Sequence, residues 1–179
     1  MNILEHKHSR RAMLTGTAAS AMAWSIVGQA RAAETFLPGI SNNYEFEVTR
    51  TDAEWMDLLG EDVFKIMRKG ETEFPTTSPY WNNNDPGVYH CKGCDLPLYS
   101  SEWYSPQEIG FVFFKHADPD SVLTGIHTTD YNGALPEPKV MMEAHCRRCG
   151  GHLGHILLIG GEILHCINGT ALELKPAEA

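Results

Sequence analysis

The 179-residue sequence lacks several features that would restrict its class. It contains no run of about eighteen unbroken apolar residues, the length that a membrane-spanning helix needs. Positive charge is scarce, with 14 lysine and arginine residues against 23 aspartate and glutamate residues and a formal net charge of −9. This balance argues against a surface for nucleic acids or anionic membranes. At this length we expect a single folded domain.

The N-terminus carries the features of a bacterial export signal. Ser9-Arg10-Arg11 is a twin-arginine pattern, moderately apolar residues follow from Leu14 to Val27, and Ala30-Arg31-Ala32 is an A-x-A cleavage site. A basic tail followed by an alanine-rich helix is the alternative. We predict that residues 1–32 are a twin-arginine signal peptide and that the mature protein is periplasmic, without membrane insertion. Because this route carries folded cargo, a metal ion can be loaded before export.

The remaining sequence predicts a linker at residues 33–43, a domain at residues 44–176 and a short tail at residues 177–179. Thr51 and Glu54 form a capping-box pattern, and apolar residues at helical spacing follow as far as Gly70, with an interruption at Gly60. This pattern predicts one broken helix or two short helices. Short β-branched and apolar runs then alternate with turn residues, which predicts a mostly β, antiparallel domain. The expected strands lie at residues 44–48, 88–90, 98–99, 111–114, 140–145, 155–159, 163–167 and 171–174.

Four of the five cysteines form two Cys-x-x-Cys units, namely Cys91 with Cys94 and Cys146 with Cys149. Each unit is followed by a residue that favours a turn, and two such turns supply the four thiolates that a tetrahedral Zn²⁺ requires. Two disulfides are the alternative for an exported protein. We favour zinc because a disulfide within so short a loop would stabilise the fold little. No βαβ pattern surrounds either unit, which argues against a thioredoxin-like redox motif.

The fifth cysteine, Cys166, matches no spacing partner. It follows a possible hairpin turn at Gly160-Gly161, and the run at 155–159 would pair across this turn with the run at 163–167. Such pairing would bring Cys166 close to His155, and a neighbouring imidazolium lowers the pKa of a thiol. The alternative is an inert buried cysteine, since free cysteines are among the most buried residues.

Several ordered motifs resemble the B-type methionine sulfoxide reductases, from about Phe46 to Pro176. The matching stretches are Gly87-Val88-Tyr89-His90-Cys91-Lys92-Gly93-Cys94, Pro97-Leu98-Tyr99-Ser100-Ser101, Glu143-Ala144-His145-Cys146-Arg147-Arg148-Cys149, His152-Leu153-Gly154-His155 and Cys166-Ile167-Asn168. The resemblance implies two antiparallel sheets clamped by a four-cysteine zinc site. It also implies reduction of the R epimer of methionine sulfoxide in proteins, here oxidised proteins of the envelope.

The resemblance also implies roles for individual residues. Cys166 matches the nucleophile that attacks the sulfoxide sulfur, and His155 matches the histidine that binds or protonates the oxygen. Asn168 matches a position that helps to hold this oxygen, and His152 completes the histidine pair. The expected products are methionine and a sulfenic acid on Cys166, which a second thiol must reduce.

The sequence departs from the family pattern at several of these positions. Gly110-Phe111-Val112-Phe113-Phe114 replaces the usual Gly-Trp-Pro-Ser-Phe, so we expect Phe111 and Phe114 to form the apolar wall against the substrate. Leu164 and Met141 stand where the family has arginines, and Ile109 stands where many members have a resolving cysteine. We therefore expect an external thioredoxin-like thiol as reductant. A zinc-stabilised binding domain without chemistry, or a reductase of another small S-oxide, are the alternatives.

Overall fold

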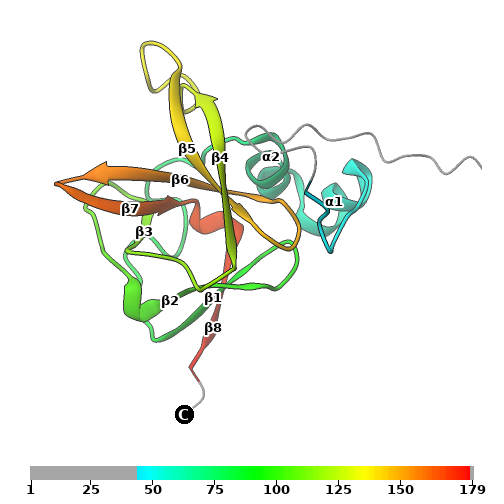
Figure 1. Ribbon diagram of the computed structural model, residues 1–179, viewed down its shortest axis with the longest axis horizontal. Helices are drawn as coiled ribbons and strands as arrows, with labels where there is room; N and C mark the ends of the chain where they lie inside the picture. Colours follow the sequence, from blue (N-terminus) through cyan, green and yellow to red (C-terminus); the bar gives the residue numbers. More distant parts are fainter. Residues whose placement is uncertain (1–43, 178–179) are drawn as a thin grey trace, which may run out of the picture. The chain divides into compact units, whose positions relative to one another are not determined.

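The computed structural model describes residues 44–177, and these form two antiparallel β sheets preceded by two short helices (Figure 1). The helices are α1 (Asp52–Leu59) and α2 (Glu61–Lys69), with short 3₁₀ turns η1 (Ser101–Trp103) and η2 (Gly169–Ala171). The strands are β1 (Gly87–Cys91), β2 (Pro97–Ser100), β3 (Val112–Phe114), β4 (Val122–Thr129), β5 (Lys139–Cys146), β6 (His152–Ile159), β7 (Glu162–Ile167) and β8 (Leu172–Pro176). The mostly β class with two antiparallel sheets is confirmed. The signal peptide and linker predicted for residues 1–43 lie outside the described residues.

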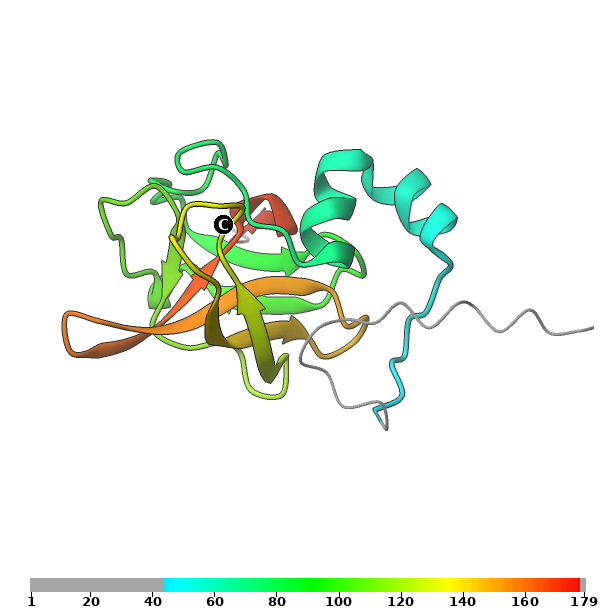
Figure 2. The ribbon, with the colours of Figure 1, turned by 90° about the horizontal axis from the view of Figure 1, so that it is seen from above.

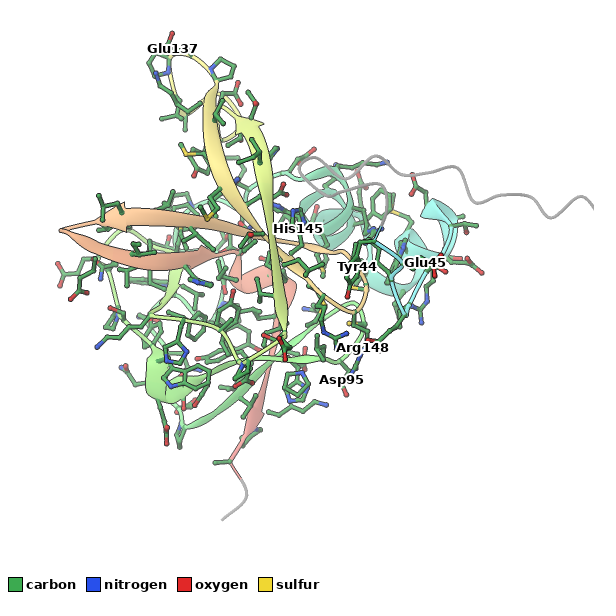
Figure 3. All side chains as sticks on the ribbon, in the orientation of Figure 1. Tyr44, Glu45, Asp95, Glu137, His145 and Arg148 are labelled. Atoms are coloured by element: carbon green, nitrogen blue, oxygen red, sulfur yellow. The ribbon has the colours of Figure 1, made fainter. Side chains whose placement is uncertain are left out.

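The two sheets have the strand orders β2-β1-β8 and β3-β7-β6-β5-β4. Figure 2 shows both helices to one side of the sheets, with α2 next to η2. The loop that joins β4 to β5, with Glu137 near its tip, projects away from the rest of the domain (Figure 3). Among the described residues, no helix has the length and apolar character needed to cross a membrane.

The helical segment is two short helices, one of the two predicted forms. Thr51 and Glu54 form the expected capping box at the start of α1. Gly60 separates the helices, and Gly70 ends α2 in the left-handed conformation that favours glycine. The hairpin turn between β6 and β7 at Gly160-Gly161 is also present as predicted.

One strand prediction was wrong, and one strand was not predicted. Residues 44–48 are not a strand; instead the Val48 N–H donates to the carbonyl of Arg148, and the ring of Phe46 packs against Gly150. Strand β4 was not predicted at all, although it carries a β-branched residue at most positions. Gly125 and the polar residues of β4 weaken the alternation of apolar and polar side chains that indicates a strand. The pairing of β4 with β5 stabilises the strand instead.

The core lies between the two sheets and is rich in aromatic rings. Tyr99 of the smaller sheet stacks on Phe114 of the larger sheet, with ring centroids 4.4 Å apart. Tyr89 meets the same Phe114 ring edge-on at 5.1 Å. Leu98 and Leu153, which contribute one side chain from each sheet, are fully buried around them. These contacts hold the sheets face to face and leave the opposite face of the larger sheet available for a site.

Glu73 joins the loop after α2 to the turn that follows β7. Its carboxylate accepts hydrogen bonds from the backbone N–H groups of Gly169 and Thr170, at 2.9 and 2.8 Å, and from the Thr170 hydroxyl. The Glu73 N–H in turn donates to the Oδ1 atom of Asn168 at 3.1 Å. Because the Glu73 side chain is buried, these bonds position the loop that covers one end of the larger sheet.

Glu73→Gln should lower the free energy of unfolding by about 1–3 kcal/mol, because a buried carboxylate that accepts three hydrogen bonds cannot be replaced by an amide that must also donate. Thermal denaturation followed by circular dichroism measures this loss. Glu71→Gln, at an exposed neighbouring position, is the matched control and should leave the melting temperature unchanged. Equal melting temperatures for both variants would contradict the assigned role of Glu73.

Candidate active site and metal-binding cluster

The four cysteines of the two Cys-x-x-Cys units come together at one place. The Sγ atoms of Cys91 and Cys149 are 3.7 Å apart, those of Cys94 and Cys146 are 3.4 Å apart, and all four lie within 4.8 Å of one another. Sulfur atoms around a tetrahedral zinc ion stand about 3.8 Å apart, given Zn–S bonds of about 2.3 Å. All five cysteines of the chain are free. The cluster therefore has the ligand set and spacing to hold a metal ion, as the sequence indicated.

The two units adopt the same turn, which aims both sulfurs of each unit at one point. In the first, the Cys91 N–H donates to the Leu96 carbonyl and the Asp95 N–H donates back to Cys91, both at 2.8 Å. In the second, Cys146 exchanges the equivalent bonds with Gly151 and Gly150. Asp95 and Gly150 both have positive φ, 62° and 69°, which explains the turn-forming residue after each unit.

Arginines surround this cluster. The buried Arg68 side chain donates to the carbonyl of Cys149 at 3.0 Å, and its guanidinium lies 4.8 Å from the centre of the Trp55 ring. Arg148 donates to the Cys94 carbonyl at 3.2 Å, which links the second unit to the first. Four thiolates around a divalent ion carry two net negative charges, so the positive charge of Arg68 stabilises the loaded cluster.

Two of the predicted site residues, Cys166 and His155, lie on one line across the larger sheet. Phe113, Cys166, His155, Glu143 and Gly125 are successive Cα partners from β3 through β7, β6 and β5 to β4. Directly opposite residues of antiparallel strands place their side chains on the same face of the sheet. Cys166 therefore faces His155 in the register that the hairpin predicted.

Cys166 and His155 both line a cavity of about 500 Å³. Its walls come from the loop after α2, the loop before β3, the loop after β4, and strands β6 and β7. Most of the lining side chains are apolar or aromatic, among them Phe74, Phe111 and Leu157. No lysine or arginine of the described residues lines it. Such a cavity suits an apolar side chain that carries one polar atom.

Burial determines the charge state of the two facing groups. It raises the pKa of the Cys166 thiol to about 12, and the Glu73 carboxylate adds to this effect. Burial also lowers the pKa of His155 to about 3, with His152 and His127 as smaller causes. Both shifts run against the predicted activation of Cys166 by an imidazolium, because burial disfavours the charged form of each group.

His152 lies behind His155 and does not line the cavity. It is almost fully buried, and its Nδ1 atom forms a hydrogen bond with the Glu143 carboxylate. Burial alone would raise the pKa of Glu143, but the close approach of His145, at 3.2 Å, and the hydrogen bond with His152 bring it to about 2. His152 is thus a residue held in place by Glu143, while His155 is the histidine of the pair that reaches the cavity.

Asn168 lines the cavity, but its amide is already engaged in the fold. Its Nδ2 atom donates to the Leu153 carbonyl at 3.1 Å, and its Oδ1 atom accepts from the Glu73 N–H. The second hydrogen of Nδ2 is the one donor that Asn168 keeps for a bound molecule. Asn168 therefore has a positioning role, because its hydrogen bonds connect the end of β7 with β6 and with the loop that carries Glu73.

The two predicted wall residues have different surroundings. Phe111 lines the cavity, as predicted. Phe114 does not; it is fully buried and stacks on Tyr99 in the core. Side chains alternate along a strand, so Phe114 points away from the face that Phe113 shares with Cys166. His165 lies on that same core-facing side, where its Nδ1 atom is 3.2 Å from the Tyr99 hydroxyl.

Two residues of the site were not anticipated from the sequence. His127 of β4 has its Nδ1 atom 3.0 Å from Nε2 of His155. Tyr131 lines the cavity, meets the His155 ring edge-on at 5.3 Å, and has a buried hydroxyl without a hydrogen-bond partner in the described part of the chain. The sequence would have indicated these two residues only if β4 had been recognised as a strand. The pairing of β4 with β5 brings His127 to the site, and Tyr131 follows in the loop after β4.

Comparison with known proteins agrees with this site. The SelR domain family matches residues 59–176, which is more than half of the chain. The chain belongs to the SelR domain family. Similar proteins include the peptide methionine sulfoxide reductase MsrB of Agrobacterium fabrum, which is 34% identical over 134 residues, covering 73% of this chain and 94% of that protein.

Two further SelR relatives show comparable similarity. Peptide methionine sulfoxide reductase B3 of Arabidopsis thaliana is 35% identical over 135 residues, covering 73% of this chain and 72% of the relative. The peptide methionine sulfoxide reductase MsrB of Azotobacter vinelandii is 34% identical over 127 residues, covering 69% and 91% respectively. The family match at residues 59–176 contains the four-cysteine cluster and the hairpin with His155 and Cys166.

The alkylation rate of Cys166 by iodoacetamide should keep rising about tenfold per pH unit from neutral pH to beyond pH 9, because the thiolate is the reactive form and its fraction grows until the pH reaches the pKa. Mass spectrometry of the Cys166 peptide measures the rate, with EDTA present to keep trace metal ions off the nearby imidazoles. A plateau near or below neutral pH would show instead that an adjacent cation stabilises the thiolate.

Proposed function

We propose that this SelR protein is a peptide-methionine (R)-S-oxide reductase in which Cys166 and His155 perform the oxygen transfer. The observation that carries the proposal is their direct pairing across β6 and β7, on one face of the sheet and inside one apolar cavity. A methionine sulfoxide side chain combines an apolar methyl thioether with one strongly accepting oxygen. The relatives named for this reaction support the same assignment.

The charge states of the site suit the proton balance of this reaction. Sulfoxide and thiol give thioether and sulfenic acid, so exactly one proton must reach the transferred oxygen, and the protonated Cys166 thiol brings it. Neutral His155 accepts this proton as Sγ attacks the sulfoxide sulfur and returns it to the oxygen. The attack forms a bond between Sγ and the substrate sulfur. The protonated oxygen then moves from the substrate sulfur to Sγ as this S–S bond breaks, so that the substrate S–O bond is replaced by an S–O bond on Cys166 and two electrons pass from Cys166 to the substrate sulfur.

Tyr131 and Phe111 complete the substrate site in this proposal. The unpartnered Tyr131 hydroxyl lies in the cavity wall and can donate a hydrogen bond to the sulfoxide oxygen. Burial raises the pKa of Tyr131 to about 12, so the hydroxyl keeps its proton. Phe111 provides the apolar surface for the methyl group, in place of the tryptophan expected in this family.

The Cys166 sulfenic acid needs a thiol from outside the chain. Every other cysteine belongs to the four-cysteine cluster, and Ile109 stands at the cavity rim where a resolving cysteine would serve. We infer that a thioredoxin-like protein reduces Cys166 through a mixed disulfide. With the predicted twin-arginine signal, the substrates would be oxidised proteins of the bacterial envelope and the site of action the periplasm.

The four-cysteine cluster is proposed to hold structural zinc. Cys91, Cys94, Cys146 and Cys149 are its ligands, and the ion would hold the turn after β1 against the turn after β5. With four protein ligands no position remains open for substrate. The role of the ion is therefore to join the two sheets.

A binding domain without chemistry is a second candidate, because the family arginines are replaced by Leu164 and Met141. Both substitutions replace a positively charged side chain of the family pattern with an apolar one. The activity assay below separates this candidate from the reductase.

Cys166→Ser should abolish reduction of the R epimer of a methionine sulfoxide peptide with dithiothreitol as reductant. His155→Gln should lower the rate by about 10²- to 10⁴-fold, the usual contribution of a positioned acid or base. Separation of the epimers by chromatography measures both effects. The exposed His116→Gln is the matched control and should keep wild-type activity. Wild-type protein that leaves the R epimer unchanged would exclude the reductase.

Protein dialysed against EDTA should retain about one zinc ion per chain by elemental analysis, and Cys94→Ser should lose it. Because structural zinc contributes on the order of 10 kcal/mol to folding, this variant should also lose its cooperative melting transition. Cys166→Ser is the matched cysteine control and should keep both the zinc and the transition. Zinc-free wild-type protein that melts cooperatively would contradict the structural role of the ion.

A further inference from the structure

Three histidines gather on the larger sheet next to the cavity. His127 comes from β4, and His152 and His155 come from β6; the exposed fractions of their side chains are 7%, 1% and 2%. One ring nitrogen of each lies within 4.8 Å of the others. The rings of His127 and His155 are nearly parallel, and the ring centroid of His152 lies 5.5 and 5.3 Å from theirs.

His152 is oriented as metal-binding histidines are. Its Nδ1 atom is held by the Glu143 carboxylate, which leaves the lone pair on Nε2. Within residues 44–177 this buried Nε2 atom has no hydrogen-bond partner. Carboxylate–histidine pairs of this kind fix the ring and raise the basicity of the free nitrogen in metal sites. An unpartnered buried lone pair is costly, and a bound cation would satisfy it.

The spacing of the ring nitrogens is close to what an ion needs. Nitrogens bound to one tetrahedral zinc ion stand about 3.3 Å apart, given Zn–N bonds of about 2.0–2.1 Å. Nδ1 of His127 and Nε2 of His155 are 3.0 Å apart, so small ring movements suffice to admit an ion between them and His152. Glu143 supplies a negative charge next to the cluster, and no lysine or arginine lines the adjoining cavity in the described structure.

From these contacts we propose that His127, His152 and His155 form a second metal site, distinct from the four-cysteine cluster, for a divalent first-row transition ion that prefers imidazole ligands. Zn²⁺ and Co²⁺ are suitable probes of this class. Because His155 also lines the cavity, the fourth coordination position of the ion is open to small molecules there.

This site also bears on the reaction, and that consequence rests on the proposed function. A metal ion bound to His155 takes the nitrogen lone pair that would otherwise accept the Cys166 proton. Loading the second site therefore inhibits the reductase, and chelation restores it. Metal binding itself is measured without any activity, so failure of the reductase assay and failure of the metal site are separate results.

Full-length protein is first dialysed against EDTA, so that it keeps only its EDTA-resistant zinc. It is then titrated with Zn²⁺, followed by calorimetry, and with Co²⁺, followed by absorption spectroscopy. Wild-type protein should bind one additional ion per chain. The Co²⁺ added at this site should show visible d–d bands without the intense near-ultraviolet charge transfer of cobalt–thiolate bonds. Absence of an additional ion, or a spectrum dominated by thiolate charge transfer, would overturn the proposal.

His127→Gln should abolish binding of the additional ion while leaving the zinc of the four-cysteine cluster in place. His127 is a member of the histidine group and not of the four-cysteine cluster. His116→Gln, an exposed histidine outside the group, is the matched control and should bind the additional ion like wild type. If His127→Gln does not fold, the wild-type cobalt spectrum decides alone. Retention of the additional ion by folded His127→Gln would place the ion elsewhere and overturn the proposal.

Discussion

The convergence of four sulfur atoms between two sheets is the constraint on which the rest of this structure depends. Cys91 ends β1 in the smaller sheet and Cys146 ends β5 in the larger sheet, and each is followed by a turn that returns the second cysteine of its unit. The sheets share no strand, so this cluster and the aromatic core hold them together. A metal ion at such a junction stabilises contacts between residues that are far apart in the sequence. Closing the long loop between them costs conformational entropy, and the binding energy of the ion offsets this cost.

With the sheets held, the larger sheet can carry a buried polar site on the face away from the aromatic core. The alternation of side chains separates two sets of residues that are neighbours in sequence: Phe114 and His165 pack with Tyr99, while Phe113 and Cys166 point to the opposite side. This division explains how one short strand pair serves both stability and chemistry.

Burial gives the site its chemical character. Removal of water disfavours charge on both Cys166 and His155, which leaves a thiol and a neutral imidazole instead of an ion pair. The Cys166 thiol thus supplies the one proton that oxygen transfer to a thiol requires. Negative charge next to the histidines comes from Glu143, whose contact with His145 and hydrogen bond with His152 offset the cost of its burial. An ion pair between Cys166 and His155 is therefore not the feature that makes this site suited to the reaction.

The sequence by itself determined the features that depend on local spacing. The turns of both Cys-x-x-Cys units, the capping box at Thr51, the break at Gly60 and the hairpin at Gly160-Gly161 follow from a few adjacent residues, and with them the pairing of Cys166 with His155. Only the tertiary structure decided what depends on remote elements: the strand at 122–129, the contact of His127 with His155, the place of Phe114 in the core and the protonation of Cys166. Strand pairing and burial depend on contacts among many residues that are far apart in the chain. A short stretch of sequence therefore cannot predict them.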